Sequence, residues 1–180
     1  MVIGMPAAHA LANHEWQGNK PANNVRTGLL PEQVQAARWA VLNVSAPGMA
    51  LRKPAKLTSQ LHVGEVIAVK EDHMQGWATG VIRWAMHDEQ NNLDIGIQLM
   101  APTARAIGLR RPSQPSFEPA LLLPAIHALK QEASIVGPVG SFMPDRILEL
   151  DYDGRLRRIV LTTLVERTHA VERFQFKALD

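Results

Sequence analysis

The residues best suited to recognise a ligand lie in one short stretch, Asn43-Val44-Ser45-Ala46-Pro47-Gly48. The Asn43 side-chain oxygen can accept a hydrogen bond from a ligand N–H group, and the Ser45 hydroxyl can serve a base edge or a phosphate oxygen. Gly48 lets a backbone approach closely, and Pro47 stiffens the turn. The same residue types are also typical of a tight turn with only a structural role, because Asn and Ser often bond to their own backbone. The stretch is therefore either a ligand-binding element or a turn with only a structural role.

The rest of the sequence lacks the spacings of catalytic and metal sites. Its seven histidines form neither a His-Glu-x-x-His nor a His-x-His pattern, and cysteine is absent. No nucleophile elbow, phosphate-binding loop or Gly-x-Gly-x-x-Gly motif occurs. The carboxylates Glu149 and Asp151 lie on an apparent strand, where exposed charge is the default explanation. We therefore predict a protein that is not an enzyme and that has no catalytic residue, no metal site and no cofactor.

Composition narrows the class of protein further. A hydrophobic fraction of 46% in 180 residues is sufficient for a packed core. The formal net charge of +2 is too small for a typical duplex nucleic-acid binder, so nucleic acid is an unfavoured partner. Single-stranded nucleic acid on a barrel face is a weaker alternative. The absence of cysteine fits a reducing compartment, and no apolar run approaches the roughly 20 residues needed to span a bilayer. We predict a cytoplasmic protein without a membrane span.

Short apolar runs separated by turns predict an all-β fold. Leu93, Ile95, Ile97 and Leu99 alternate with polar or small residues, as in a strand with one buried side. Asp153-Gly154 is a strong hairpin signal. The other predicted strands are 38–44, 48–51, 63–69, 77–86, 120–123, 134–137, 146–150, 156–166 and 170–176. Strands at this spacing predict two tandem small β-barrel-like units.

We predict three segments: an N-terminal linker with a short helix at 1–35, a first barrel at 36–102 and a second barrel-like unit at 103–180. The linker is rich in Asn, Pro and Gly, as loops are. The apolar stretch from Val2 to Ala12 has the composition of the last turns of a helix. It favours a chain that is the C-terminal piece of a longer protein, with an upstream domain.

Between Arg38 and Ala101 the sequence resembles the PilZ family of cyclic di-GMP receptors. That family carries an Asp/Asn-x-Ser-x-x-Gly element between two strands of a small barrel, and Asn43 to Gly48 matches it. The stretches Gly80-Val81-Ile82-Arg83-Trp84 and Ile95-Gly96-Ile97-Gln98-Leu99 look like the closing strands of that barrel. The resemblance implies that Asn43, Ser45 and Gly48 contact the nucleotide, with Asn43 accepting from the N–H edge of guanine.

The chain differs from the family in its positively charged side chains. PilZ domains also use an Arg-x-x-x-Arg pair some twenty residues before this element, where the present chain has only Lys20 and Arg26. Arg26 is therefore the upstream candidate for ligand binding, with Arg38, Arg52 and Arg83 as possible substitutes for the missing pair. We expect Arg83 to point away from Trp84, because adjacent residues of a strand face opposite sides. The four tryptophans are expected to pack in the core or at its rim.

Two hypotheses follow from the resemblance. In the first, the chain is a PilZ-like, non-catalytic sensor of cyclic di-GMP in bacterial signalling. In the alternative, it is a degenerate PilZ-like scaffold that binds no nucleotide and works through contacts with an unknown protein partner. A sensor needs cationic side chains that converge on the Asn43–Gly48 turn, whereas a scaffold needs an exposed apolar patch.

Overall fold

The computed structural model describes residues 1–17, 36–53, 61–72 and 76–179, and these residues are mostly in strands. One long helix, α1 (Met5–Gln17), follows a short strand, β1 (Val2–Ile3), and a single turn of 3₁₀ helix, η2, spans His127–Leu129. The first unit continues with β2 (Ala40–Ser45), β3 (Gly48–Lys53), β4 (Val66–Val69), β5 (Ala78–His87) and β6 (Leu93–Ala101). The second unit comprises β7 (Arg105–Arg110), β8 (Glu118–Leu123), β9 (Ser134–Pro138), β10 (Ile147–Tyr152), β11 (Arg155–Arg167) and β12 (Val171–Leu179).

The first unit is a six-stranded antiparallel sheet in the order β1-β4-β5-β6-β3-β2. Its inner face carries the alternating apolar residues of the middle strands, which form one core cluster: Met49, Leu51, Ile67, Val69, Ala78, Ile82, Ile95 and Ile97. The side chains on the opposite face are small or polar at positions 48, 50 and 52 of β3 and at positions 94, 96 and 98 of β6, because each strand alternates. This opposite face carries the candidate site.

The second unit is a closed barrel in the order β10-β11-β12-β9-β8-β7. β10 and β11 are joined by Asp153 and Gly154, whose φ angles of 52° and 71° both lie in the left-handed region. Two consecutive positive φ angles are what a tight two-residue hairpin turn requires, so the predicted hairpin is confirmed. Large apolar side chains fill the barrel interior, among them Phe174, Leu161 and Ile107, and none of these three is exposed.

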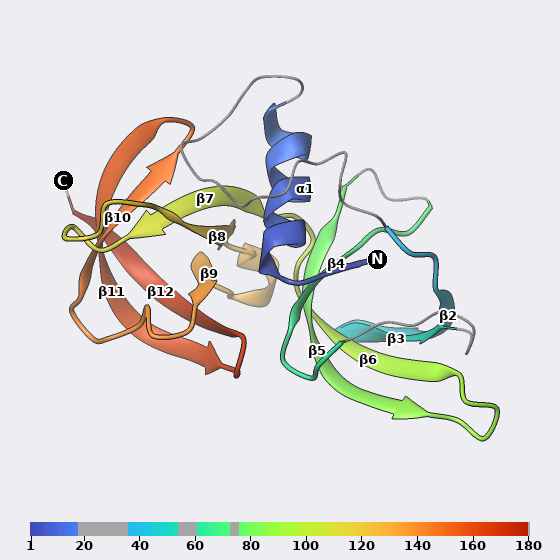
Figure 1. Ribbon diagram of the computed structural model, residues 1–180. Coiled ribbons are helices and arrows are strands. Elements are labelled where there is room, and N and C mark those ends of the chain that lie inside the picture. The colour runs from blue at the N-terminus through green and yellow to red at the C-terminus, as the bar shows by residue number, and fades with distance from the viewer. Residues whose placement is uncertain (18–35, 54–60, 73–75, 180) are drawn as a thin grey trace.

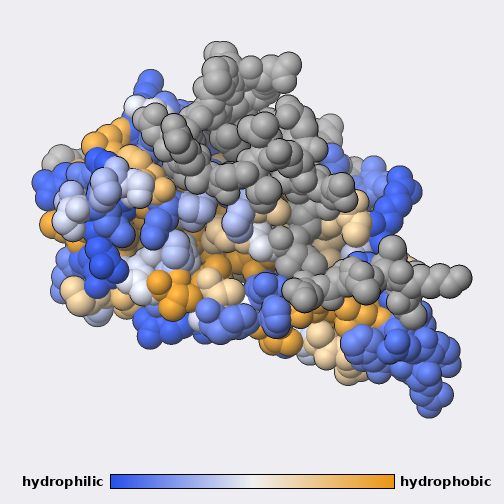
Figure 2. Space-filling view, viewed as in Figure 1, coloured by the Kyte–Doolittle hydropathy of each residue, from blue (hydrophilic) through white to orange (hydrophobic). Residues whose placement is uncertain are grey.

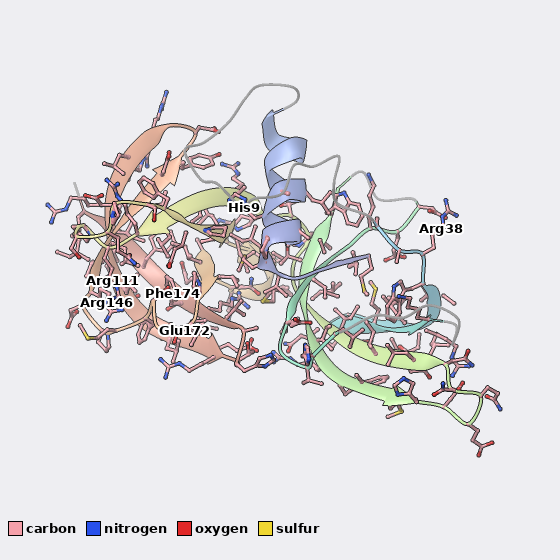
Figure 3. All side chains as sticks on the ribbon, in the orientation of Figure 1. His9, Arg38, Arg111, Arg146, Glu172 and Phe174 are labelled. Carbon is pink, nitrogen blue, oxygen red and sulfur yellow. The ribbon has the colours of Figure 1, made fainter. Side chains whose placement is uncertain are left out.

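Helix α1 lies between the two units (Figure 1) and packs against both. Ala8 and Ala12 share a core cluster with Val66 of the sheet and Leu121 of the barrel. Small side chains on α1 allow this close approach from both sides. His9, on the side of α1 that faces the barrel (Figure 3), is 2% exposed, and its Nε2–H donates to the carbonyl oxygen of Ile107 at 3.1 Å. The helix therefore joins the two units.

The predicted all-β fold of two tandem units with a partly helical N-terminal segment is confirmed. Two details differ from the sequence-based interpretation. The strand β7 was not predicted, because its four middle residues are all buried and its sequence does not alternate between apolar and polar residues. Asp151 is only 3% exposed rather than a solvated surface charge, and Glu149 is half-buried and paired with Arg110 at 2.7 Å. In the described parts of the chain, no helix is long and apolar enough to cross a membrane.

Candidate functional site

A row of four residues crosses the outer face of the first sheet. Asn43 of β2 pairs with Ala50 of β3, Ala50 pairs with Gly96 of β6, and Gly96 pairs with Trp84 of β5. Residues directly opposite each other in antiparallel strands point to the same face. The row therefore places an amide at one end and an indole at the other, with only a methyl group and a hydrogen atom between them.

Arg83 joins this row because β5 is bulged there. The register runs from Ile82↔Ile97 directly to Trp84↔Gly96, so Arg83 has no partner of its own on β6. A bulge breaks strand alternation, and both Arg83 and Trp84 are exposed and border the same pocket. The expectation that Arg83 points away from Trp84 was wrong for this reason. Trp84 itself is 39% exposed, so it lies at the surface of the pocket rather than in the core.

The pocket over this row, which we call the Asn43–Trp84 pocket, has a volume of about 350 Å³. Figure 2 shows the hydrophilic end of the β5–β6 hairpin at the lower right, with apolar residues along the sheet beside it. The described residues that line the pocket include one cation, Arg83, and no carboxylate: Asn43, Ser45, Pro47, Gly48, Met49, Ala50, Arg83, Trp84, Gly96, Ile97 and Gln98. Its charge and its polar groups therefore suit an anion with a hydrogen-bonding edge.

The floor of the Asn43–Trp84 pocket depends on two glycines. A Cβ atom at position 96 would lie 2.0 Å from the indole nitrogen of Trp84, so the indole packs directly on the Gly96 backbone. A Cβ atom at position 48 would lie 1.9 Å from the carbonyl oxygen of Ile97. Gly48 is extended and does not have a positive φ. Its role is thus close packing of β3 on β6, which keeps the floor flat.

The predicted ligand-binding residues Asn43 and Ser45 lie on the wall formed by β2. The Ser45 hydroxyl donates to the carbonyl oxygen of Gly48 at 3.1 Å across the turn, which leaves its oxygen lone pairs as acceptors. The Asn43 side chain is exposed and makes no hydrogen bond to any described residue. The turn is therefore structural at Ser45, and it also presents a polar group, Asn43, that is available to a ligand.

The other predicted arginines that the structure describes, Arg38 and Arg52, do not converge on this pocket. Arg38 borders a separate pocket of about 450 Å³ near Met1 and Trp77, on the far right of Figure 3, where Glu71 and Asp72 are also present. Arg52 donates two hydrogen bonds to Asp94, at 2.8 and 2.7 Å, and these bonds hold the pKa of the Asp94 carboxyl below its usual range. Arg26 lies outside the described residues. Among the candidate arginines that the structure describes, only Arg83 lies beside Asn43, Ser45 and Gly48.

The chain matches two known protein families. A family described as "Cyclic-di-GMP receptor FimW, middle PilZ domain" matches residues 4–106, which is more than half of the 180 residues. The chain belongs to the FimW family. The predicted PilZ resemblance is thereby confirmed, and the matched FimW region contains the whole Asn43–Trp84 pocket. A second FimW family, "FimW C-terminal beta-barrel domain", matches residues 103–179, which form the closed barrel.

A curated relative supports the same assignment. The cyclic-di-GMP receptor FimW of Pseudomonas aeruginosa is 29% identical over 144 residues, which cover 78% of the present chain and 24% of that protein. The chain thus spans about a quarter of the length of this FimW relative. No solved structure matches the chain.

Two features of this FimW-family site were not predicted from the sequence. Trp84 was assigned to packing, and Gly96 was interpreted only as part of a strand. The signal for both is the spacing of Trp84 and Gly96 across the β5–β6 hairpin, but the bulge at Arg83 shifts the pairing by one residue. Among the residues that the structure describes, no group of His, Asp or Glu side chains is arranged to hold a metal ion.

Proposed function

We propose that this chain is a non-catalytic module that binds cyclic di-GMP in the Asn43–Trp84 pocket and acts in bacterial signalling. The observation that carries the proposal is the cross-strand row that brings Asn43, Trp84 and the neighbouring Arg83 around one pocket in a chain of the FimW family. Each of these three groups suits a different part of the ligand.

The chemistry of a guanine nucleotide fits these groups. The oxygen of Asn43 can accept from the N–H edge of guanine, and the exposed face of the Trp84 indole can stack on a base. Stacking on an aromatic side chain contributes about 1–3 kcal/mol per base. Arg83 can donate two N–H groups to a phosphate, which is a stronger arrangement than a single neutral hydrogen bond.

The same lining argues against catalysis. Neither a carboxylate nor a histidine is among the described residues of the Asn43–Trp84 pocket, and its one hydroxyl, Ser45, donates to a backbone carbonyl instead of to a base. A hydroxyl nucleophile needs a general base within hydrogen-bond reach. The proposal is therefore a receptor that is not an enzyme and that needs no cofactor.

We propose further that the module works in the cytoplasm, in contact with an upstream domain or a protein partner. The predicted division at 1–35, 36–102 and 103–180 belongs to this proposal, with ligand binding assigned to 36–102. The alternative function, a scaffold that binds no nucleotide, is favoured by one observation. Val41, Leu42 and Val44 of β2 are between 44% and 58% exposed at the edge of the described sheet. Exposed apolar strand edges are typical of protein contacts.

The test is calorimetric titration of the purified chain with cyclic di-GMP, with GTP as the control ligand. We expect micromolar or tighter binding, weakened about tenfold by Asn43→Ala and by about tenfold or more by Trp84→Ala. Arg83→Ala should weaken binding strongly, whereas Arg38→Ala, which changes an exposed arginine of the other pocket, should not. Wild-type protein that binds no cyclic di-GMP at high micromolar concentration would refute the receptor and favour the scaffold.

A further inference from the structure

Arg83 contacts both units of the molecule. Its Nε donates to Oε1 of Gln98 at 2.7 Å, within the first sheet. Its Nη1 donates to Oε1 of Glu166, which lies on β11 of the closed barrel. Because Arg83 also lines the Asn43–Trp84 pocket, one guanidinium faces the pocket and the neighbouring barrel together.

Glu166 has a second arginine beside it. Arg173 of β12 lies directly opposite Glu166 in the β11–β12 register, and its Nε donates to the Ser134 hydroxyl at 2.9 Å. Burial lowers the pKa of Arg173, and the negative charge of Glu166 acts against that shift. If Arg83 turned away, the Glu166 carboxylate would still have a cation on the adjacent strand. The Arg83–Glu166 pair can therefore open with a positive charge still on the strand next to Glu166.

A second contact between the units lies next to this pair. The Thr168 hydroxyl donates to the carbonyl oxygen of Gly64 at 2.8 Å, and the Gly64 N–H donates to the carbonyl oxygen of Ile82 at 2.7 Å. Ile82 precedes Arg83 directly in β5. The end of the β11–β12 hairpin is thus attached to the first sheet at the bulge that carries Arg83.

We infer that Glu166 of the closed barrel is an affinity-determining residue of the Asn43–Trp84 pocket, because it competes with the ligand phosphate for the Arg83 guanidinium. This inference rests on the proposed function. Arg83 is the one cationic side chain among the described lining residues, so a phosphate in the pocket must interact with its guanidinium. A phosphate and the Glu166 carboxylate repel each other when they share a guanidinium.

The inference links the pocket to the barrel. Linkage is reciprocal, so a contact that holds Glu166 on Arg83 lowers ligand affinity, and bound ligand weakens the contact between the β11–β12 hairpin and the first sheet. Ligand binding in the pocket would then change how firmly the barrel contacts the first sheet, at the hairpin end that contains Glu166 and Thr168.

The experiment compares cyclic di-GMP binding by the wild-type chain, Glu166→Gln and Glu166→Ala, with Glu149→Gln as the matched control. Glu149 also pairs with an arginine on the barrel, Arg110 at 2.7 Å, but does not line the pocket. Both Glu166 variants should bind about threefold to tenfold more tightly, and Glu149→Gln should bind as the wild type does. The glutamine amide could itself donate a hydrogen bond to the phosphate. The alanine variant has no such donor, so tighter binding by both variants must come from the loss of the carboxylate.

Hydrogen exchange on the unmodified chain gives a second measurement. Saturating cyclic di-GMP should cause a loss of protection at the Ala170 and Val171 amides, which donate to the Thr168 hydroxyl. Unchanged or weaker binding by both Glu166 variants, or unchanged protection at these amides, would overturn the inference while leaving the receptor intact. If neither the wild type nor either Glu166 variant binds, the proposed function itself fails.

Discussion

Lowering the pH toward 4 should destabilise the protein, because His9 is buried in its neutral form between α1 and the barrel. The imidazole is 2% exposed and donates to the Ile107 carbonyl oxygen, and burial lowers its pKa from 6.5 to about 4. Between these two values the unfolded chain binds a proton at His9 that the folded chain does not bind. The free energy of unfolding therefore has its full value above about pH 6.5 and falls as the pH decreases toward about 4.

The size of the effect follows from the two pKa values. A difference of about 2.5 pH units corresponds to about 3 kcal/mol in total, of which about 2 kcal/mol is lost by about pH 5. Protonation of carboxylates changes the free energy of unfolding in a different pH range. The pKa values of Asp88 and Asp94 are lowered from 3.8, so their stabilisation is lost only below that pH.

The assay is urea denaturation followed by circular dichroism at several pH values from about 7.5 to about 4.5, with linear extrapolation to water. The control is His9→Gln, whose amide N–H can still donate to Ile107 but does not titrate in this range. Every other residue is the same in both proteins, so the difference between the two curves isolates His9. Parallel curves for the wild type and His9→Gln would refute the reasoning that His9 is buried in its neutral form.

Three other changes test the packing. Gly96→Ala should destabilise the protein by about 1–3 kcal/mol in urea denaturation, because the new Cβ collides with the Trp84 indole; an unchanged midpoint would mean that Trp84 does not pack there. Thr168→Val should cost about 1–3 kcal/mol on the same measure, because the hydroxyl bonds to Gly64 between the units. Phe174→Ala, at a fully buried barrel position, should lower the free energy of unfolding by about 3–5 kcal/mol, and a loss below about 1 kcal/mol would contradict its place in the core.

Local signals in the chain were sufficient to predict most of the strands. The alternation at Leu93–Leu99 and the Asp153-Gly154 turn predicted β6 and the β10–β11 hairpin, because each depends on neighbours within a few residues. The strand β7 was missed for the converse reason. Its middle residues are buried on both sides, by α1 and by the barrel interior, so its pattern does not alternate. A strand buried on both faces lacks the period that identifies a half-exposed one.

The candidate site was only partly predictable. The Asn43–Gly48 element was recognised because its residues are contiguous, and the structure places Asn43, Ser45 and Gly48 on one pocket. The choice among the arginines could not be made from the sequence. Arg52 is hydrogen-bonded to Asp94, and Arg38 lies at another pocket. Both placements depend on strand order and register, which no local pattern encodes.

The sequence by itself determined the all-β class, the tandem units and the candidate Asn43–Gly48 element, since strand period, turn chemistry and a contiguous motif are properties of neighbouring residues. The tertiary structure alone decided that Trp84 and Arg83 share a pocket with Asn43, and that Glu166 reaches Arg83 from the other unit. A single bulge in β5 and the packing of two units around α1 set these contacts. Both arise from long-range pairing, whose free energy depends on the whole sheet and not on the residues at the site.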